Sequence, residues 1–62
     1  MSNQGFEKAE EMVFTFRRAE FELLAWMDGN KAAGRRARKL LDQIANDKVA
    51  LRKAMIHADR NP

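Results

Sequence analysis

The feature that most constrains this chain is the tripeptide Asp28-Gly29-Asn30, which separates two long stretches of strong helix formers. Ala, Glu, Leu, Lys, Arg and Met dominate both stretches, and the only proline is Pro62. Neither stretch alternates apolar and polar residues with the period of two that is typical of a strand. We therefore predict an all-α fold with helices over about residues 6–27 and 31–59, preceded by a flexible tail over residues 1–5.

The Asp28-Gly29-Asn30 segment also predicts how the two helices are joined. Gly29 suits the left-handed backbone position that follows the last turn of a helix. Asn30 suits the N-cap of the next helix, where its side-chain oxygen accepts a hydrogen bond from a free backbone N–H. A connection this short folds the second helix back along the first. We expect the 62 residues to form one domain, an antiparallel two-helix hairpin.

The length of the chain makes the stability of such a hairpin marginal. Domains of about 60 residues bury only about 60% of the surface that the unfolded chain exposes, and small folds usually rely on disulfides, a metal or a partner chain. The sequence has no cysteine, and no carboxylates cluster near its one histidine, His57. We therefore expect no metal site and no cofactor, and we expect assembly into a dimeric helical bundle or a higher oligomer.

The first helix carries more apolar surface than one partner helix can cover. Its broad apolar face contains one charged residue, Glu20. Phe14 and Phe21 lie outside this face, and exposed aromatic strips of this kind usually mark an interface. We expect oligomerisation through the aromatic side chains Phe14, Phe21, Phe16 and Trp26. The broad face comprises Phe6, Ala9, Met12, Val13, Phe16, Ala19, Leu23, Leu24, Trp26 and Met27.

The second helix has one apolar seam with the three–four spacing of coiled-coil packing. The seam begins with small residues, including Ala33 and Gly34, which let a neighbouring helix approach closely. Leu23 and Trp26 of the first helix are the expected covers for this part. The seam is interrupted around residues 47–48, where both side chains are charged. Its apolar positions are Ala33, Ala37, Leu40, Leu41, Ile44, Leu51, Met55 and Ala58.

Charge is divided unevenly between the two halves of the chain. Residues 1–30 carry three Lys or Arg and six Asp or Glu, a net charge of −3, whereas residues 31–62 carry nine and three, a net charge of +6. Such asymmetry indicates either a polyanionic partner or electrostatic pairing of the two halves. The sequence leaves both interpretations open.

Five basic residues lie within nine positions at the start of the second helix. A helix N-terminus already attracts phosphate through its free N–H groups and its dipole, so these cations predict a phosphate-contact surface. The same run is also typical of a solvated face or of a partner for acidic residues such as Glu20, Glu22 and Asp28. The candidate contact residues are Lys31, Arg35, Arg36, Arg38 and Lys39, with Arg52 and Lys53 farther along the helix.

The sequence shows no apparatus for catalysis. It has no Ser/His/Asp set, no phosphate-cradling glycine loop and no poised carboxylate pair, so we predict neither enzymatic activity nor a small-molecule substrate. No apolar run approaches the roughly 18 residues that a membrane span requires. The start MSNQGFEKAEE lacks the basic and apolar regions of a signal peptide. We expect a soluble, cytoplasmic protein.

The segment GNKAAGRRARKLL, residues 29–41, resembles the signature of bacterial linker-histone-like nucleoid proteins of the chlamydial histone-like type. In that family a Gly-Asn-Lys-Ala-Ala turn opens a basic helix within a short helical domain. The resemblance implies DNA binding without strong sequence preference, which organises or compacts a bacterial or phage genome in the nucleoid. Carried over by position, the DNA-contacting cations are Lys31, Arg35, Arg36, Arg38 and Lys39.

A second hypothesis is a small protein-interaction or assembly adaptor. In that case the basic face docks on an acidic protein, and Phe14 and Phe21 bind the partner. Burial of these two rings between copies of the chain argues against this hypothesis, and their exposure favours it. A third alternative is an amphipathic binder of membrane surfaces, against which the acidic residues of the first helix argue.

Overall fold

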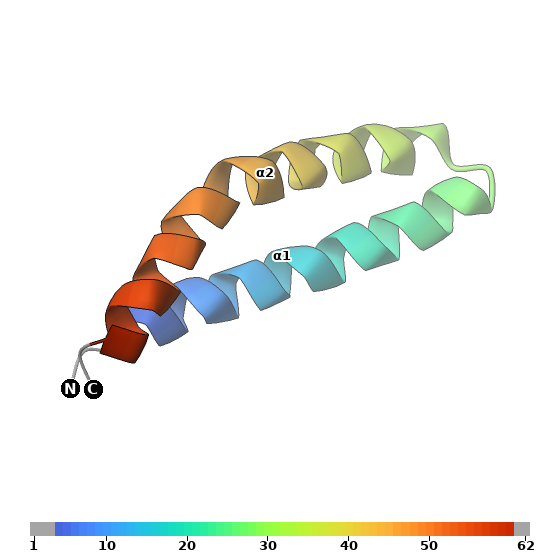
Figure 1. The fold of residues 1–62 in the computed structure, drawn as a ribbon. Helices are drawn as coiled ribbons and strands as arrows, with labels where there is room; N and C mark the ends of the chain where they lie inside the picture. Colours follow the sequence, from blue (N-terminus) through green and yellow to red (C-terminus); the bar gives the residue numbers. More distant parts are fainter. Residues whose placement is uncertain (1–3, 61–62) are drawn as a thin grey trace.

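The structure, a computed structural model, describes residues 4–60 and consists there of two helices. Helix α1 spans Gln4–Met27 and helix α2 spans Lys31–Arg60. They run antiparallel as a hairpin, with the start of α1 and the end of α2 at the same end of the molecule (Figure 1). The predicted all-α hairpin is confirmed. The helix boundaries differ from the prediction by one or two residues, because residues 4 and 5 of the expected tail belong to α1; residues 1–3 of that tail lie outside the described residues.

The turn is a Schellman motif whose last residue also caps the next helix. Gly29 has a φ of 102°, and its N–H donates to the carbonyl of Trp26 at 2.9 Å. The N–H of Asn30 donates to the carbonyl of Ala25 at 3.1 Å, which is the longer hydrogen bond of this motif. The Asn30 side-chain oxygen in turn accepts from the N–H of Ala33 at 3.0 Å. Both predicted roles, the left-handed Gly29 and the N-cap Asn30, are confirmed.

The core between the helices is thin and made largely of small residues. Among the buried residues are Ala19 of α1 and Ala33 and Ala37 of α2. Thr15 is also buried, and its hydroxyl donates to the carbonyl of Glu11 at 2.9 Å, so its polar atom has a partner. Small side chains let the helix axes approach closely, but they bury little apolar area. The buried apolar residues are Met12, Ala19, Ala33, Ala37 and Leu40.

The predicted broad face of α1 is only partly correct. Helix α1 is rotated so that Thr15 and Ala19 face α2, whereas Phe16 remains 53% exposed. The side of α2 that faces α1 carries the buried Ala33 and Ala37, and close packing against such small residues favours small side chains at the facing positions of α1. Glu20, which conflicted with the predicted face, is exposed and therefore solvated. The other residues of that face that remain exposed are Phe6, Val13, Leu24, Trp26 and Met27.

The hairpin exposes more surface than a compact protein of its mass. Its accessible surface is 5432 Å², whereas folded monomers of 7.2 kDa expose about 4,100 Å² by the usual scaling with mass. The difference of about 1,300 Å² follows from the elongated shape, whose extents are 46 × 16 × 11 Å. A single hairpin therefore leaves a large part of its apolar surface in contact with water.

Candidate nucleic-acid interface

The basic side chains of α2 lie on the side of this helix that faces away from α1. In an α-helix, residues two positions apart lie on nearly opposite sides. Lys31 and Arg35 flank the buried Ala33 at this spacing, and Lys39 follows the buried Ala37 by two residues. The tight packing of the alanine positions against α1 therefore directs the long cationic side chains outward.

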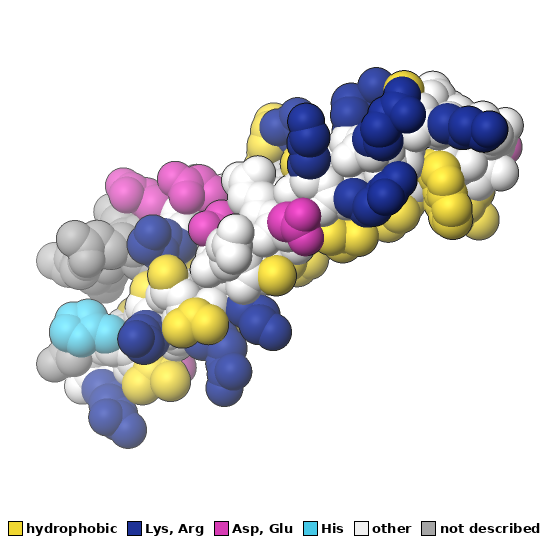
Figure 2. Space-filling view, turned by 90° about the horizontal axis from the view of Figure 1, so that it is seen from above, with side chains coloured by type: hydrophobic (Ala, Val, Ile, Leu, Met, Phe, Trp, Pro, Cys, Tyr) yellow, Lys and Arg dark blue, Asp and Glu magenta, His cyan; other side chains and the backbone are white. Residues whose placement is uncertain are grey.

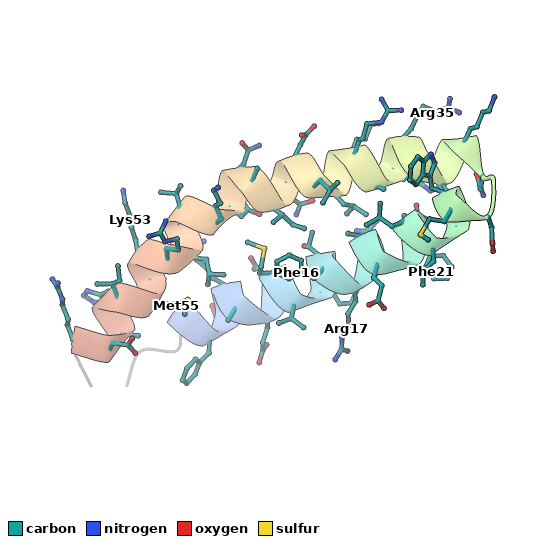
Figure 3. The ribbon with its side chains drawn as sticks, turned by 45° about the vertical axis from the view of Figure 1, so that its right-hand side comes forward. Phe16, Arg17, Phe21, Arg35, Lys53 and Met55 are labelled. Carbon is teal, nitrogen blue, oxygen red and sulfur yellow. The ribbon has the colours of Figure 1, made fainter. Side chains whose placement is uncertain are left out.

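The same spacing continues along the helix. Arg38 precedes the buried Leu40 by two residues, and Lys53 follows the half-buried Leu51 by two. Figure 3 shows Arg35 and Lys53 projecting from the side of α2 away from α1. The seven cations predicted from the sequence are all exposed: Lys31, Arg35, Arg36, Arg38, Lys39, Arg52 and Lys53.

These cations form two groups along α2 rather than one continuous patch. Figure 2 looks onto this side of the molecule and shows Lys and Arg gathered near the turn and again toward the other end, with acidic side chains between them. The exposed Asp42 and Asp47 belong to this middle segment. We name Lys31, Arg35, Arg38 and Lys39 the turn-end basic group, and Arg52, Lys53 and Arg60 the carboxyl-end basic group.

Arg36 differs from the other candidates because it forms an ion pair with a residue of α1. Its Nε donates to Oε2 of Glu22, and the Glu22 side chain is only 12% exposed while that of Arg36 is 55% exposed. Glu22 is one of the three acidic residues that the sequence offers as partners for the basic run. The structure brings Arg36 and Glu22 together, whereas Arg35 and Lys39 point away from α1.

The start of α2 adds positive potential to the turn-end basic group. The first turn of α2 contains no acidic residue, and Lys31 is its first position. The N-terminal end of a helix carries a partial positive charge of about half a unit, and Lys31 adds to it. An anion near this end of the hairpin is therefore attracted by the helix dipole as well as by the side chains.

The predicted interface aromatics are all exposed in the single hairpin. Phe14 is 65%, Phe21 72%, Phe16 53% and Trp26 54% exposed. Trp26 nevertheless lies against Gly34, as expected for a cover of the small seam residues. A shallow hollow on the outer side of α1 is lined by Phe6, Ala9, Glu10, Val13, Phe14 and Arg17.

Other kinds of site are not seen in the described part of the chain. Within it, no group of three or more His, Asp or Glu residues could hold a metal ion. None of its helices combines the length and the apolar character needed to cross a membrane.

The comparison with known families decides how this hairpin is classified. The family described as histone H1-like protein Hc1 matches residues 4–61, which include both helices and the turn. This chain belongs to the Hc1 family. No curated protein and no solved structure gives a significant match. Hc1 proteins are histone-like DNA-binding proteins and are not typically enzymes, so the resemblance first noted in residues 29–41 extends over nearly the whole chain.

Proposed function

We propose that this Hc1-family hairpin binds DNA without sequence preference and helps to organise or compact a bacterial or phage genome in the nucleoid. The observation that carries this proposal is the turn-end basic group, four exposed cations at the start of α2. Among them, Arg35 projects from the side of α2 away from α1 (Figure 3). Family membership supports the same class of ligand.

The chemistry of the group favours contacts to the phosphate backbone. Lys and Arg bound to phosphate oxygens position a protein on the duplex but carry no sequence information. The half of the chain that contains α1 has a net charge of −3 and the half that contains α2 a net charge of +6. This field orients the hairpin so that α2 approaches the duplex. The carboxyl-end basic group supplies a second contact, since Arg35 and Lys53 are about 27 Å apart along α2.

The test is a titration of random-sequence duplex DNA by fluorescence anisotropy at several salt concentrations. The affinity of a phosphate-binding protein falls with salt, with a slope of about −0.9 in log K against log[salt] for each phosphate neutralised. The Arg35→Ala/Arg38→Ala/Lys39→Ala variant is expected to bind more weakly and to lower this slope by about 2.7. Absent or salt-insensitive binding by the wild type overturns the proposal.

The matched control removes three exposed cations that lie outside the turn-end basic group. Lys8→Ala/Arg18→Ala/Lys48→Ala lowers the net charge by the same three units as the test variant. If phosphate contacts reside on the turn-end group, the control loses much less affinity than the test variant. Equal losses in both variants mean that net charge alone drives binding and that the site assignment is wrong.

A second candidate function is the protein-interaction adaptor, and the exposure of Phe14 and Phe21 favours it. In that case the two rings bind a different protein, and the hairpin is monomeric in solution. Sedimentation equilibrium distinguishes the two candidates. A monomer that binds no DNA favours the adaptor, whereas a self-associating protein that binds DNA favours the histone-like function.

A further inference from the structure

One side of α1 is an apolar strip that the hairpin leaves uncovered. Phe14 and Phe21 each follow a buried residue of α1 by two positions, Met12 and Ala19 respectively, so their rings point away from α2. The neighbouring apolar residues extend this surface along the helix. We name the strip formed by Phe6, Val13, Phe14, Phe21 and Leu24 the α1 outer strip; each of its side chains is at least half exposed.

The excess surface of the hairpin is larger than the area that pairing with a second copy of the chain would bury. The hairpin exposes about 1,300 Å² more than a compact monomer of its mass. A stable protein–protein interface of standard size buries about 800 Å² on each partner. Pairing through the α1 outer strip therefore removes a large part of the excess and covers the aromatic rings.

The α1 outer strip is complementary to itself when two copies of α1 pack antiparallel. A two-fold axis between Val13 and Phe14 brings Val13 of each copy opposite Phe14 of the other. The same register brings Phe6 opposite Phe21, so aromatic rings meet on both sides of the axis. A closed two-fold dimer requires this kind of self-complementary surface.

Charges also match in this register. Glu10 of one copy lies opposite Arg17 of the other, and symmetry provides this pair twice. Both residues line the shallow hollow of α1 together with Val13 and Phe14. The hollow therefore offers apolar walls and one charge of each sign to the ring that the second copy presents.

The pairing decides where the DNA-contacting sides lie. The two α1 helices are central and the two α2 helices are outermost, since the strip and the basic groups are on opposite sides of the hairpin. Figure 3 shows this opposition, with Arg35 and Lys53 on the α2 side and Arg17 projecting from α1 on the other side. With packed helices about 8–10 Å apart and about 10–12 Å wide, the two basic surfaces are separated by about 35–40 Å.

We infer that two copies pair through the α1 outer strip and that this pair bridges two separate DNA duplexes. The inference rests on the proposed function, because it places two DNA-binding surfaces back to back. A straight duplex that is bound to one basic surface cannot also contact the basic surface on the opposite side of the dimer. Wrapping a single duplex around a body of this size is opposed by the stiffness of DNA, whose persistence length is about 150 bp.

The test combines sedimentation equilibrium, DNA anisotropy and capture of a labelled duplex by a bead-bound duplex. The wild type is expected to sediment as a dimer and to capture the second duplex. Phe14→Ala/Phe21→Ala is expected to bind single duplexes by anisotropy while its capture falls at least about ten-fold, and Ala favours the helix at both positions. Leu41→Ala/Val49→Ala removes exposed apolar residues of α2 instead and is expected to keep both dimer and capture.

A charge exchange tests the interface even if the double Phe variant unfolds. Glu10→Arg alone is expected to weaken the dimer, because it places two cations opposite each other. Glu10→Arg/Arg17→Glu is expected to restore the dimer and the capture of the second duplex. Failure of the exchange to restore the dimer overturns the register.

Single cysteines test the same register, since the natural chain has none. Phe14→Cys is expected to cross-link readily between copies with a short bismaleimide. Leu24→Cys is not expected to cross-link, because the two copies of residue 24 lie about 31 Å apart along the helices in this register. Preferential cross-linking at residue 24 contradicts it.

The outcomes separate the bridge from the proposed function. A dimer that binds DNA but captures no second duplex overturns bridging and leaves DNA binding intact. Unchanged capture by a monomeric variant also overturns bridging through this interface. A wild type that dimerises but binds no DNA overturns the proposed function and bridging with it, while the α1 interface stands.

Discussion

The indole of Trp26 occupies the space in which a side chain on Gly34 would begin. A Cβ atom on Gly34 would lie 3.0 Å from Nε1 and 3.2 Å from Cγ of Trp26, and closer still to Cδ1. This contact joins the last turn of α1 to the first turns of α2, next to the turn-end basic group. It gives Gly34 a role in packing, because the helical backbone there does not itself require glycine.

The first prediction is that Gly34→Ala destabilises the hairpin. Ala is favoured over Gly in a helix interior by about 1 kcal/mol, but overpacking typically costs about 1–3 kcal/mol, so we expect a net loss. The indole must move outward, which shifts Trp26 emission to longer wavelength. Urea denaturation followed by circular dichroism, at fixed protein concentration, measures the change in the free energy of unfolding.

The control for this prediction reverses the sign of the effect. In a Trp26→Ala background the space beside residue 34 is empty. Gly34→Ala should then stabilise the hairpin by about 1 kcal/mol through helix propensity alone. A loss of stability in both backgrounds shows that something other than Trp26 excludes the methyl group.

The second prediction is that Gly29→Ala destabilises the hairpin through its backbone alone. Gly29 has a φ of 102°, and a Cβ there would meet no atom within 4 Å. Because an L-residue is strained at positive φ, we expect a loss of about 1–2 kcal/mol. Thermal unfolding of Gly29→Ala and Gly29→Asn checks it. The Asn variant is expected to lose less stability than the Ala variant, since Asn tolerates a left-handed backbone better. Equal losses of stability in the two variants contradict the explanation.

The third prediction concerns the cap of α2. Asn30→Ala removes the oxygen that accepts from the Ala33 N–H, and loss of such a cap costs about 1 kcal/mol. Asn30→Asp keeps an accepting oxygen and is expected to retain most of the stability. The urea midpoints of the two variants provide the comparison. An Asp variant as unstable as the Ala variant shows that the side-chain oxygen is not what matters.

The fourth prediction is that Arg36 contributes less to DNA affinity than Arg35. Arg36 donates to Glu22, whereas Arg35 projects away from α1. Arg36→Ala is therefore expected to weaken DNA binding less than Arg35→Ala, and Glu22→Ala is expected to strengthen it by releasing a cation. Anisotropy titrations at one salt concentration rank the three variants. The reverse order for the two arginines contradicts this view of the pair.

The turn could be predicted from the sequence because its signals are local. Glycine, the residue at position 29, is the only residue type that adopts positive φ without strain, and asparagine, the residue at position 30, is a preferred N-cap. The interactions of both residues span at most five positions along the chain. The outward direction of Lys31, Arg35 and Lys39 was equally predictable, since helical periodicity relates them to the alanines of the seam.

The rotation of α1 about its own axis could not be predicted in the same way. Its apolar residues occupy so much of the circumference that periodicity alone did not choose between Phe16 and Thr15 as the buried position. Thr15 carries a polar atom, which counts against burial in a sequence pattern. Its hydrogen bond to the Glu11 carbonyl removes that cost.

The sequence by itself therefore determined two helices, their antiparallel connection and a basic outward side on α2, because each depends on residues close together in the chain. Only the tertiary structure decided which side of α1 remains uncovered. Which side of α1 is covered depends on how closely α1 can pack against the alanines of α2. This packing is a property of two surfaces in contact. The close approach places Ala19 inside and leaves Phe21 exposed.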